Sequence, residues 1–146
     1  MNSKPISVNP LNGKSYLIPK NNIIIATRVG LGKFCILKQD TAINQDLRAI
    51  IPKDNTKLSI MYLFYWFKSI SEKIISAGKG FTVKGVNLNF LKSLNFPYCS
   101  IEEQESIVKK ISLLFKEYEV LISITEQQIK NLQSLKPSLL AQKLKN

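Results

Sequence analysis

The sequence predicts an α+β fold, in which a small domain with hairpin strands and one packed helix is followed by a long C-terminal coiled-coil helix. Two observations carry this prediction. β-Branched and aromatic runs separated by glycines occupy residues 23–51, which is typical of short strands. From Val108 onward, apolar residues recur at alternating spacings of three and four, the pattern of a coiled-coil seam. We therefore expect two units, residues 1–100 and residues 101–146.

The first unit is expected to begin with irregular chain and to continue as a hairpin. Residues 1–20 contain an Asn-Gly pair and three prolines, which predict turns and extended chain. Residues 23–27 are a β-branched run suited to a buried strand, and residues 33–37 return as a second strand after a glycine-containing loop. A further strand-like stretch at residues 41–51 closes at Pro52.

One helix is expected between Leu58 and Ala77. Its apolar positions are continuous at first and then recur at helical spacing, which fits a helix that is buried on most of its first half. Gly78 and Gly80 end this helix, and residues 81–89 are expected to form a short extended or turn region.

The C-terminal helix has a well-specified beginning. Ser100 as N-cap and Glu103 three positions later form a capping box, while Glu102 and Glu105 place negative charge in the positive first turn. Pro137 removes a helical hydrogen bond, so we expect a kink and then a short second helix. The seam residues, which we expect to form a dimer interface, are Val108, Ile111, Phe115, Tyr118, Ile122, Thr125, Ile129 and Leu132.

The formal net charge of +11 is unevenly distributed along the chain. Residues 101–146 hold seven lysines against six glutamates, a balance of +1, whereas residues 1–100 hold 14 basic and 4 acidic side chains, a balance of +10. A basic unit joined to a nearly neutral helix indicates that the first meets a polyanion and the second meets protein. The alternative is a unit that lysine merely keeps soluble.

Several classes of function are disfavoured by composition. The chain contains no histidine, which removes Ser-His and Cys-His nucleophile pairs and the commonest general base. Cys35 and Cys99 lie far apart in sequence, so neither a disulfide framework nor a zinc site is indicated, and no cofactor is expected. The longest apolar run stops at Lys68, well short of the roughly 20 residues that span a bilayer. Residues 1–20 lack the features of a secretory signal, so we expect a cytoplasmic protein.

Two short motifs suggest chemistry that their surroundings do not support. Gly-Leu-Gly-Lys at residues 30–33 lacks the other residues of a phosphate-binding loop, since Thr27 and Phe34 stand at two of its required positions. Asn-Phe-Pro-Tyr at residues 95–98 resembles the loop with which amino-methyltransferases hold a target base, but Phe96 replaces a proline and no cofactor-binding sheet precedes it. A short strand that ends at Pro97, followed by the helix cap, is the favoured interpretation.

The junction before the long helix carries a more specific resemblance. An apolar-Pro segment is followed by Ser-Ile-Glu-Glu-Gln-Glu-Ser-Ile-Val at residues 100–108, after an aromatic-rich helix and Gly-Phe-Thr-Val-Lys-Gly-Val at residues 80–86. This arrangement resembles the specificity subunit of type I DNA restriction-modification systems. The hairpin at residues 23–37, the strand with Asn44-Gln45 and the closing stretch at residues 131–140 are also similar to that family.

The resemblance implies a non-catalytic role in DNA recognition. Such subunits usually hold two target recognition domains and two helices, which pack antiparallel as a ruler between DNA half-sites, and they place methyltransferase and endonuclease subunits on DNA. This chain resembles one half, in which the opening portion of the recognition domain is missing or replaced by residues 1–20. The implied partners are double-stranded DNA, a second copy bound through the helix, and the modification and restriction subunits.

Candidate DNA contacts are basic and amide side chains of the first unit. Arginine, asparagine and glutamine can make bidentate contacts with base edges, whereas lysine mostly attracts phosphate. The candidates are Arg28 and Lys33 at the hairpin tip, Lys38, Asn44, Gln45 and Arg48 on the next strand, and Lys79, Lys84, Asn87 and Asn89 after the glycines. The alternative function is that of a truncated or degenerate subunit, a coiled-coil interaction module whose first unit does not bind specific DNA.

Overall fold

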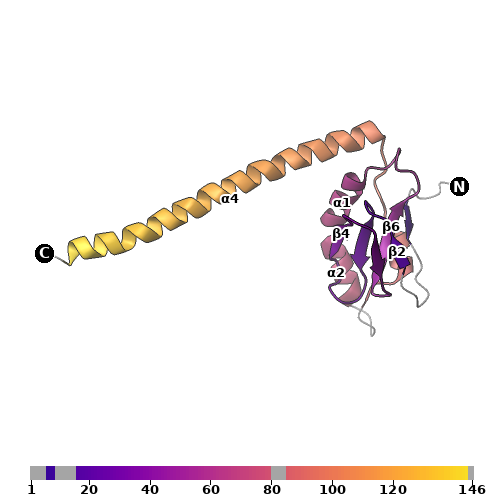
Figure 1. Ribbon diagram of the computed structural model, residues 1–146, viewed down its shortest axis with the longest axis horizontal. Helices are drawn as coiled ribbons and strands as arrows, with labels where there is room; N and C mark the ends of the chain where they lie inside the picture. Colours follow the sequence, from indigo (N-terminus) through magenta and orange to yellow (C-terminus); the bar gives the residue numbers. More distant parts are fainter. Residues whose placement is uncertain (1–5, 9–15, 80–84, 145–146) are drawn as a thin grey trace. The chain divides into compact units, whose positions relative to one another are not determined.

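A computed structural model describes residues 6–8, 16–79 and 85–144 (Figure 1). The chain divides into two compact units, Met1–Val108 and Lys109–Asn146, which we call the head and the tail. The division lies inside the last helix, eight residues beyond the position expected from the sequence. The first two turns of that helix therefore belong to the head.

The head is built on a four-stranded antiparallel sheet of order β1-β6-β3-β4 and a two-stranded sheet of β2 and β5. In the larger sheet, Ile24 of β3 lies opposite Cys35 of β4 and Ala49 of β6. In the smaller sheet, Leu17 of β2 lies opposite Ala42 of β5. The strands are β1 (Ile6–Val8), β2 (Tyr16–Ile18), β3 (Ile23–Ala26), β4 (Phe34–Ile36), β5 (Thr41–Ile43) and β6 (Leu47–Pro52).

The predicted β3–β4 hairpin is confirmed, but the strands around it differ from expectation. Residues 41–51 are not one strand, because a turn divides them into β5 and β6. The Asn44 side-chain oxygen accepts a hydrogen bond from the Asp46 amide at 3.0 Å, which stabilises this turn. Asn44 and Gln45 therefore lie on the turn, and only Arg48 of this group lies on a strand. Residues 1–20, expected to be turns and extended chain, contribute β1 and β2.

The single helix expected before Gly78 is two helices, α1 (Ile60–Ser69) and α2 (Ser71–Lys79). Ser59 caps α1 by accepting a hydrogen bond from the Tyr62 amide. A third helix, α3 (Leu88–Ser93), occupies part of the region expected to be extended. Asn87 is its N-cap, and Asn89 lies in its first turn. The side-chain oxygen of Asn87 accepts a hydrogen bond from the Phe90 amide at 2.8 Å.

The larger sheet separates two apolar clusters. Alternate residues of a strand point to opposite faces, so Ile23 and Ile25 join Leu63 and Phe67 of α1 in the larger cluster. All four are at most 1% exposed. Ile24 points to the other face and packs against the smaller cluster, which consists of Ile18, Leu37, Ile43 and Ala49. Both faces of this sheet therefore pack against an apolar cluster.

The last helix, α4 (Ile101–Lys143), is continuous through Pro137, so a separate second helix does not form. Its predicted N-cap is confirmed, because the Ser100 hydroxyl accepts a hydrogen bond from the Glu103 amide at 3.3 Å. From Leu113 to Leu144 all described side chains are exposed. None of the helices in the described ranges is both long and apolar enough to cross a membrane.

Candidate nucleic-acid interface

The tip of the β3–β4 hairpin is shaped by two glycines. Gly30 and Gly32 have φ angles of 74° and 80°, a region that favours glycine. The Lys33 amide donates a hydrogen bond to the Gly30 carbonyl at 2.9 Å and closes the turn. A Cβ atom on Gly32 would lie 2.5 Å from Cγ1 of Ile75 in α2. The glycines therefore serve the turn and its packing on α2, which explains them without a bound nucleotide.

Three segments of the head meet at Thr27, directly before Arg28. The amide and hydroxyl of buried Thr27 both donate to the Asp46 carbonyl, at 2.8 and 3.1 Å. The Thr27 carbonyl accepts a hydrogen bond from the Val86 amide at 2.8 Å. These bonds join the hairpin tip to the β5–β6 turn and to the segment before α3. Arg28 itself lies on the surface, with its side chain 55% exposed and Nη1 3.5 Å from Oδ1 of Asp46.

The β5–β6 turn places two further candidates at this end of the sheet. Ala26 at the end of β3 lies opposite Leu47 at the start of β6, so Gln45 and Arg48 lie near the hairpin tip. Arg48 Nη1 donates to the Gln45 and Leu47 carbonyls, both at 3.0 Å, which folds its guanidinium back over the turn. The Gln45 side chain is exposed. We call Arg28, Lys33, Gln45 and Arg48 the tip cluster.

The other predicted contacts are not part of this cluster. Lys38 follows the opposite end of β4, where the Leu37 amide bonds to the Asn22 carbonyl. At about 3.3 Å per residue along a strand, the five positions from Lys33 to Lys38 span up to roughly 17 Å. Asn44 and Asn87 use their side-chain oxygens within a turn and a helix cap. Asn89 is exposed on α3, while all of Lys84 and the side chain of Lys79 lie outside the described residues.

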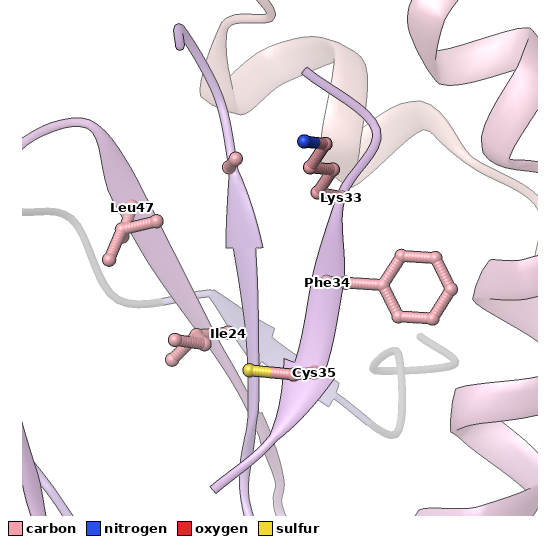
Figure 2. A pocket seen from close by; sticks show the side chains of 6 residues that line it. Ile24, Lys33, Phe34, Cys35 and Leu47 are labelled. Atoms are coloured by element: carbon pink, nitrogen blue, oxygen red, sulfur yellow. The ribbon is translucent and has the colours of Figure 1, made fainter. Parts of the chain in front are cut away.

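A shallow hollow of about 220 Å³ lies on the sheet next to Lys33 of the tip cluster (Figure 2). Its lining is mostly apolar and comes from adjacent strands β6, β3 and β4, with the Lys33 ammonium at one end. Within the described part of the chain, no group of three or more His, Cys, Asp or Glu could hold a metal ion. The lining residues are Ile24, Ala26, Lys33, Phe34, Cys35 and Leu47.

The stretch at residues 95–98 has a structural role in the core of the head. The Phe96 ring packs edge-on against Tyr62 and Trp66, with centroid distances of 5.7 and 4.9 Å. The Tyr62 hydroxyl donates a hydrogen bond to the Pro97 carbonyl at 2.9 Å, and burial raises the pKa of Tyr62 to about 12. The short strand expected to end at Pro97 is not formed, and the stretch packs against α1 as an irregular segment.

Gln104 is a key residue of the head that the sequence interpretation missed. Its side chain is 0% exposed. Its Oε1 accepts a hydrogen bond from the Ser59 amide at 2.9 Å, and its Nε2 donates to the carbonyls of Lys57 at 3.0 Å and Cys99 at 2.8 Å. The amide thus fastens the first turn of α4 to the start of α1. A neutral glutamine within a run of glutamates was the available signal.

The predicted seam divides between the two units. Val108 packs against the larger cluster of the head, and Ile111 is half-buried. Thr125 donates its hydroxyl hydrogen to the Leu121 carbonyl within α4, at 2.8 Å. The remaining seam residues are exposed on the tail: Phe115, Tyr118, Ile122, Ile129 and Leu132. The tail therefore presents apolar side chains that are exposed in the described part of the chain.

The architecture has counterparts among known proteins. A family described as the type I restriction modification DNA specificity domain matches residues 7–134. The chain belongs to this family. The MjaIX specificity subunit of Methanocaldococcus jannaschii is 32% identical over 96 residues, which cover 66% of this chain and 22% of that subunit. The EcoR124I/EcoR124II specificity subunit of Escherichia coli is 32% identical over 105 residues, 68% of this chain and 26% of that subunit.

Solved structures of type I systems share the fold. The HsdS subunit of Thermoanaerobacter tengcongensis has a TM-score of 0.61 at 19% identity, covering 72% of this chain and 24% of that one. A chain from a structural study of type I complex assembly has a TM-score of 0.68 at 18% identity, covering 82% and 29%. The α+β fold with a long C-terminal helix is thereby confirmed. The chain spans about a quarter of the length of these relatives.

Proposed function

We propose that this specificity-family chain is a non-catalytic half-subunit that recognises duplex DNA through its head. One observation carries the proposal: hydrogen bonds at Thr27 bring the tip cluster together from separate segments, within a region that carries most of the positive charge. Clustered cations attract the phosphate backbone, and nearby guanidinium and amide groups can contact base edges. The family relationship supports the same conclusion.

Different members of the tip cluster suit different contacts. The exposed guanidinium of Arg28 and the side-chain amide of Gln45 can each form two parallel hydrogen bonds with a base. The Lys33 ammonium is a point charge that suits a phosphate. Arg48 is already bonded to two carbonyls, so it supports the turn and adds positive charge. The candidates outside the cluster are better suited to peripheral backbone contacts.

Salt-dependent binding tests this function. Arg28→Ala combined with Lys33→Ala should weaken duplex binding, and the slope of log K against log salt should fall by about 0.9 for each phosphate that is no longer neutralised. Lys20→Ala combined with Lys38→Ala is the matched control, because it removes the same charge at the opposite end of the hairpin. The control should bind more tightly than the tip variant. Absence of duplex binding by the wild type, even at low salt, would contradict this function.

The tail supports a second part of the proposal, in which two copies pair through their helices. The exposed seam residues supply the apolar surface for such pairing. An antiparallel pair would separate two DNA-binding heads and act as a ruler between half-sites. The methyltransferase and endonuclease subunits of a type I system are then the further partners. The alternative, an interaction module without specific DNA binding, is also favoured by the exposed seam.

A heptad insertion distinguishes the ruler from the interaction module. Seven residues added between Gln127 and Gln128 keep the seam in phase and lengthen each helix by about 10.5 Å. This length corresponds to roughly three base pairs at about 3.4 Å each. The gap between half-sites selected from a random duplex pool should therefore widen. An unchanged gap, or one undivided site for both proteins, would contradict the ruler.

A further inference from the structure

Asp46 is attached to the hairpin tip by its own main chain. Its amide donates to the Asn44 side-chain oxygen at 3.0 Å, and its carbonyl accepts the two hydrogen bonds from Thr27. Thr27 is only 5% exposed and directly precedes Arg28. These bonds hold the main chain of Asp46 beside Thr27, so the Asp46 carboxylate is attached within reach of the Arg28 guanidinium.

The carboxylate engages one part of the guanidinium. Oδ1 of Asp46 lies 3.5 Å from Nη1 of Arg28, and the Nη2 and Nε donors are not used by this ion pair. Arginine carries five N–H donors in a planar fork, and two neighbouring donors suffice for a bidentate contact with guanine O6 and N7. Arg28 can thus keep its partner and still contact a base.

Asp46 is an unusual charge for its surroundings. Residues 1–100 contain four acidic residues against 14 basic ones. Asp40 accepts a hydrogen bond from the Lys20 amide. Asp54 forms an ion pair with Lys57, in which Oδ2 lies 3.6 Å from Nζ. Asp46 instead pairs with a member of the tip cluster. An exposed ion pair of this kind contributes little to stability, so a folding role alone explains it poorly.

We propose that Asp46 is a positioning residue that directs Arg28 towards a base edge and away from the DNA backbone. The inference rests on the proposed DNA-binding function of the head. A carboxylate beside the guanidinium repels an approaching phosphate, whereas base edges carry no formal charge. Asp46 therefore lowers affinity for duplexes of any sequence and raises the ratio of specific to non-specific affinity.

The test uses the full chain and a half-site selected from a random duplex pool by the wild type. Affinity is measured for that duplex and for a shuffled duplex at several salt concentrations. Asp46→Asn removes the charge while leaving the main-chain bonds in place. Asp40→Asn makes the same charge change at the opposite end of the hairpin and keeps an acceptor for the Lys20 amide. Asp46→Glu restores the carboxylate.

Asp46→Asn should bind the shuffled duplex about three- to tenfold more tightly, with the salt slope steeper by about 0.9 if Arg28 then neutralises a phosphate. The ratio of selected to shuffled affinity should fall by about tenfold, within the usual range for one bidentate contact. Asp40→Asn should raise both affinities equally and leave the ratio unchanged. Asp46→Glu should recover part of the ratio.

The outcomes separate this inference from the function on which it rests. A wild type that binds no duplex overturns both. A wild type that binds every duplex equally overturns the positioning role and leaves general DNA binding. The positioning role is also overturned if Asp46→Asn keeps the wild-type ratio of selected to shuffled affinity. It is equally overturned if Asp40→Asn lowers that ratio as much as Asp46→Asn does. A steeper slope and lower ratio for Asp46→Asn alone support the positioning role, because loss of folding would not tighten non-specific binding.

Discussion

The head and the tail use apolar side chains in opposite ways. In the head, Leu63, Phe67 and Ile74 are at most 1% exposed and pack against the sheet. In the tail, Leu121 and Ile129 are exposed, like every other described side chain from Leu113 onward. A buried core supports its own fold, whereas a long helix gains most of its stability by packing against something else. The head is therefore stabilised by its own core, whereas the tail keeps its apolar side chains exposed.

Charge separates the two units less sharply than the sequence suggests. With the boundary at Val108, the glutamates at 102, 103 and 105 belong to the head. The head then holds 14 basic and seven acidic residues, a balance of +7, and the tail holds seven lysines and three glutamates, a balance of +4. Both units are basic. The use of apolar residues, rather than net charge, is what distinguishes them.

The largest effect is expected from charges placed in the seam of the tail. Phe115→Asp combined with Ile122→Asp would bury four carboxylates in a dimer, so association should weaken by about 1000-fold or more. Light scattering should then report a monomer, while the unfolding transition of the head, followed by Trp66 fluorescence, should change little.

The matched control for the seam is Ser123→Asp combined with Gln127→Asp, which adds the same charge outside the seam and should remain a dimer. A wild type that is monomeric with a folded tail would contradict self-association. The helix would then require a different partner.

A pair of leucine truncations tests the contrast in burial directly. Leu63→Ala should lower the free energy of unfolding of the head by about 2–5 kcal/mol, because it leaves a cavity in the larger cluster. Leu121→Ala removes the same atoms from the exposed tail and should change that transition by less than about 0.5 kcal/mol. Denaturant titration with Trp66 fluorescence measures both. Equal effects would show that the head and tail unfold as one unit.

A pair of glutamine truncations in α4 sharpens the position of the boundary. Gln104→Ala should destabilise the head by about 2–3 kcal/mol, because it leaves two carbonyls and an amide without their buried partner. Gln127→Ala removes an exposed hydrogen bond to Asn131 and should cost less than about 0.5 kcal/mol. The same titration applies. A decrease below about 1 kcal/mol for Gln104→Ala would place the start of α4 outside the cooperative unit.

The smallest effect is the alkaline titration of Tyr62. Its folded pKa of about 12 lies above the ordinary value of 10.0, so the folded state keeps a proton that the unfolded state loses. Stability should therefore fall from about pH 10 and level off above about pH 12. Tyr62→Phe should lack this part of the pH dependence, whereas Tyr98→Phe, at an exposed site, should retain it. Identical pH profiles for wild type and Tyr62→Phe would contradict the assignment.

Features that depend on near neighbours could be predicted from the sequence alone. The Ser100 cap, the β3–β4 hairpin and the long amphipathic helix each arise from residues within a few positions of one another. Local hydrogen bonds and apolar periodicity are readable from such short spacings. The junction at residues 100–108 also indicated the family before any fold was known, and the family match confirms it.

The roles of the polar side chains depend on contacts between distant parts of the chain. Asn44 and Asn87 have chemistry suited to bases, yet one stabilises a turn and the other caps a helix. Gln104 bonds to Lys57 across 47 positions, and Asp46 meets Arg28 across 18. Contacts over such separations depend on how strands and helices pack, and no local periodicity encodes them. The core therefore selects which of many basic and amide residues form one surface, and the sequence supplies only the candidates.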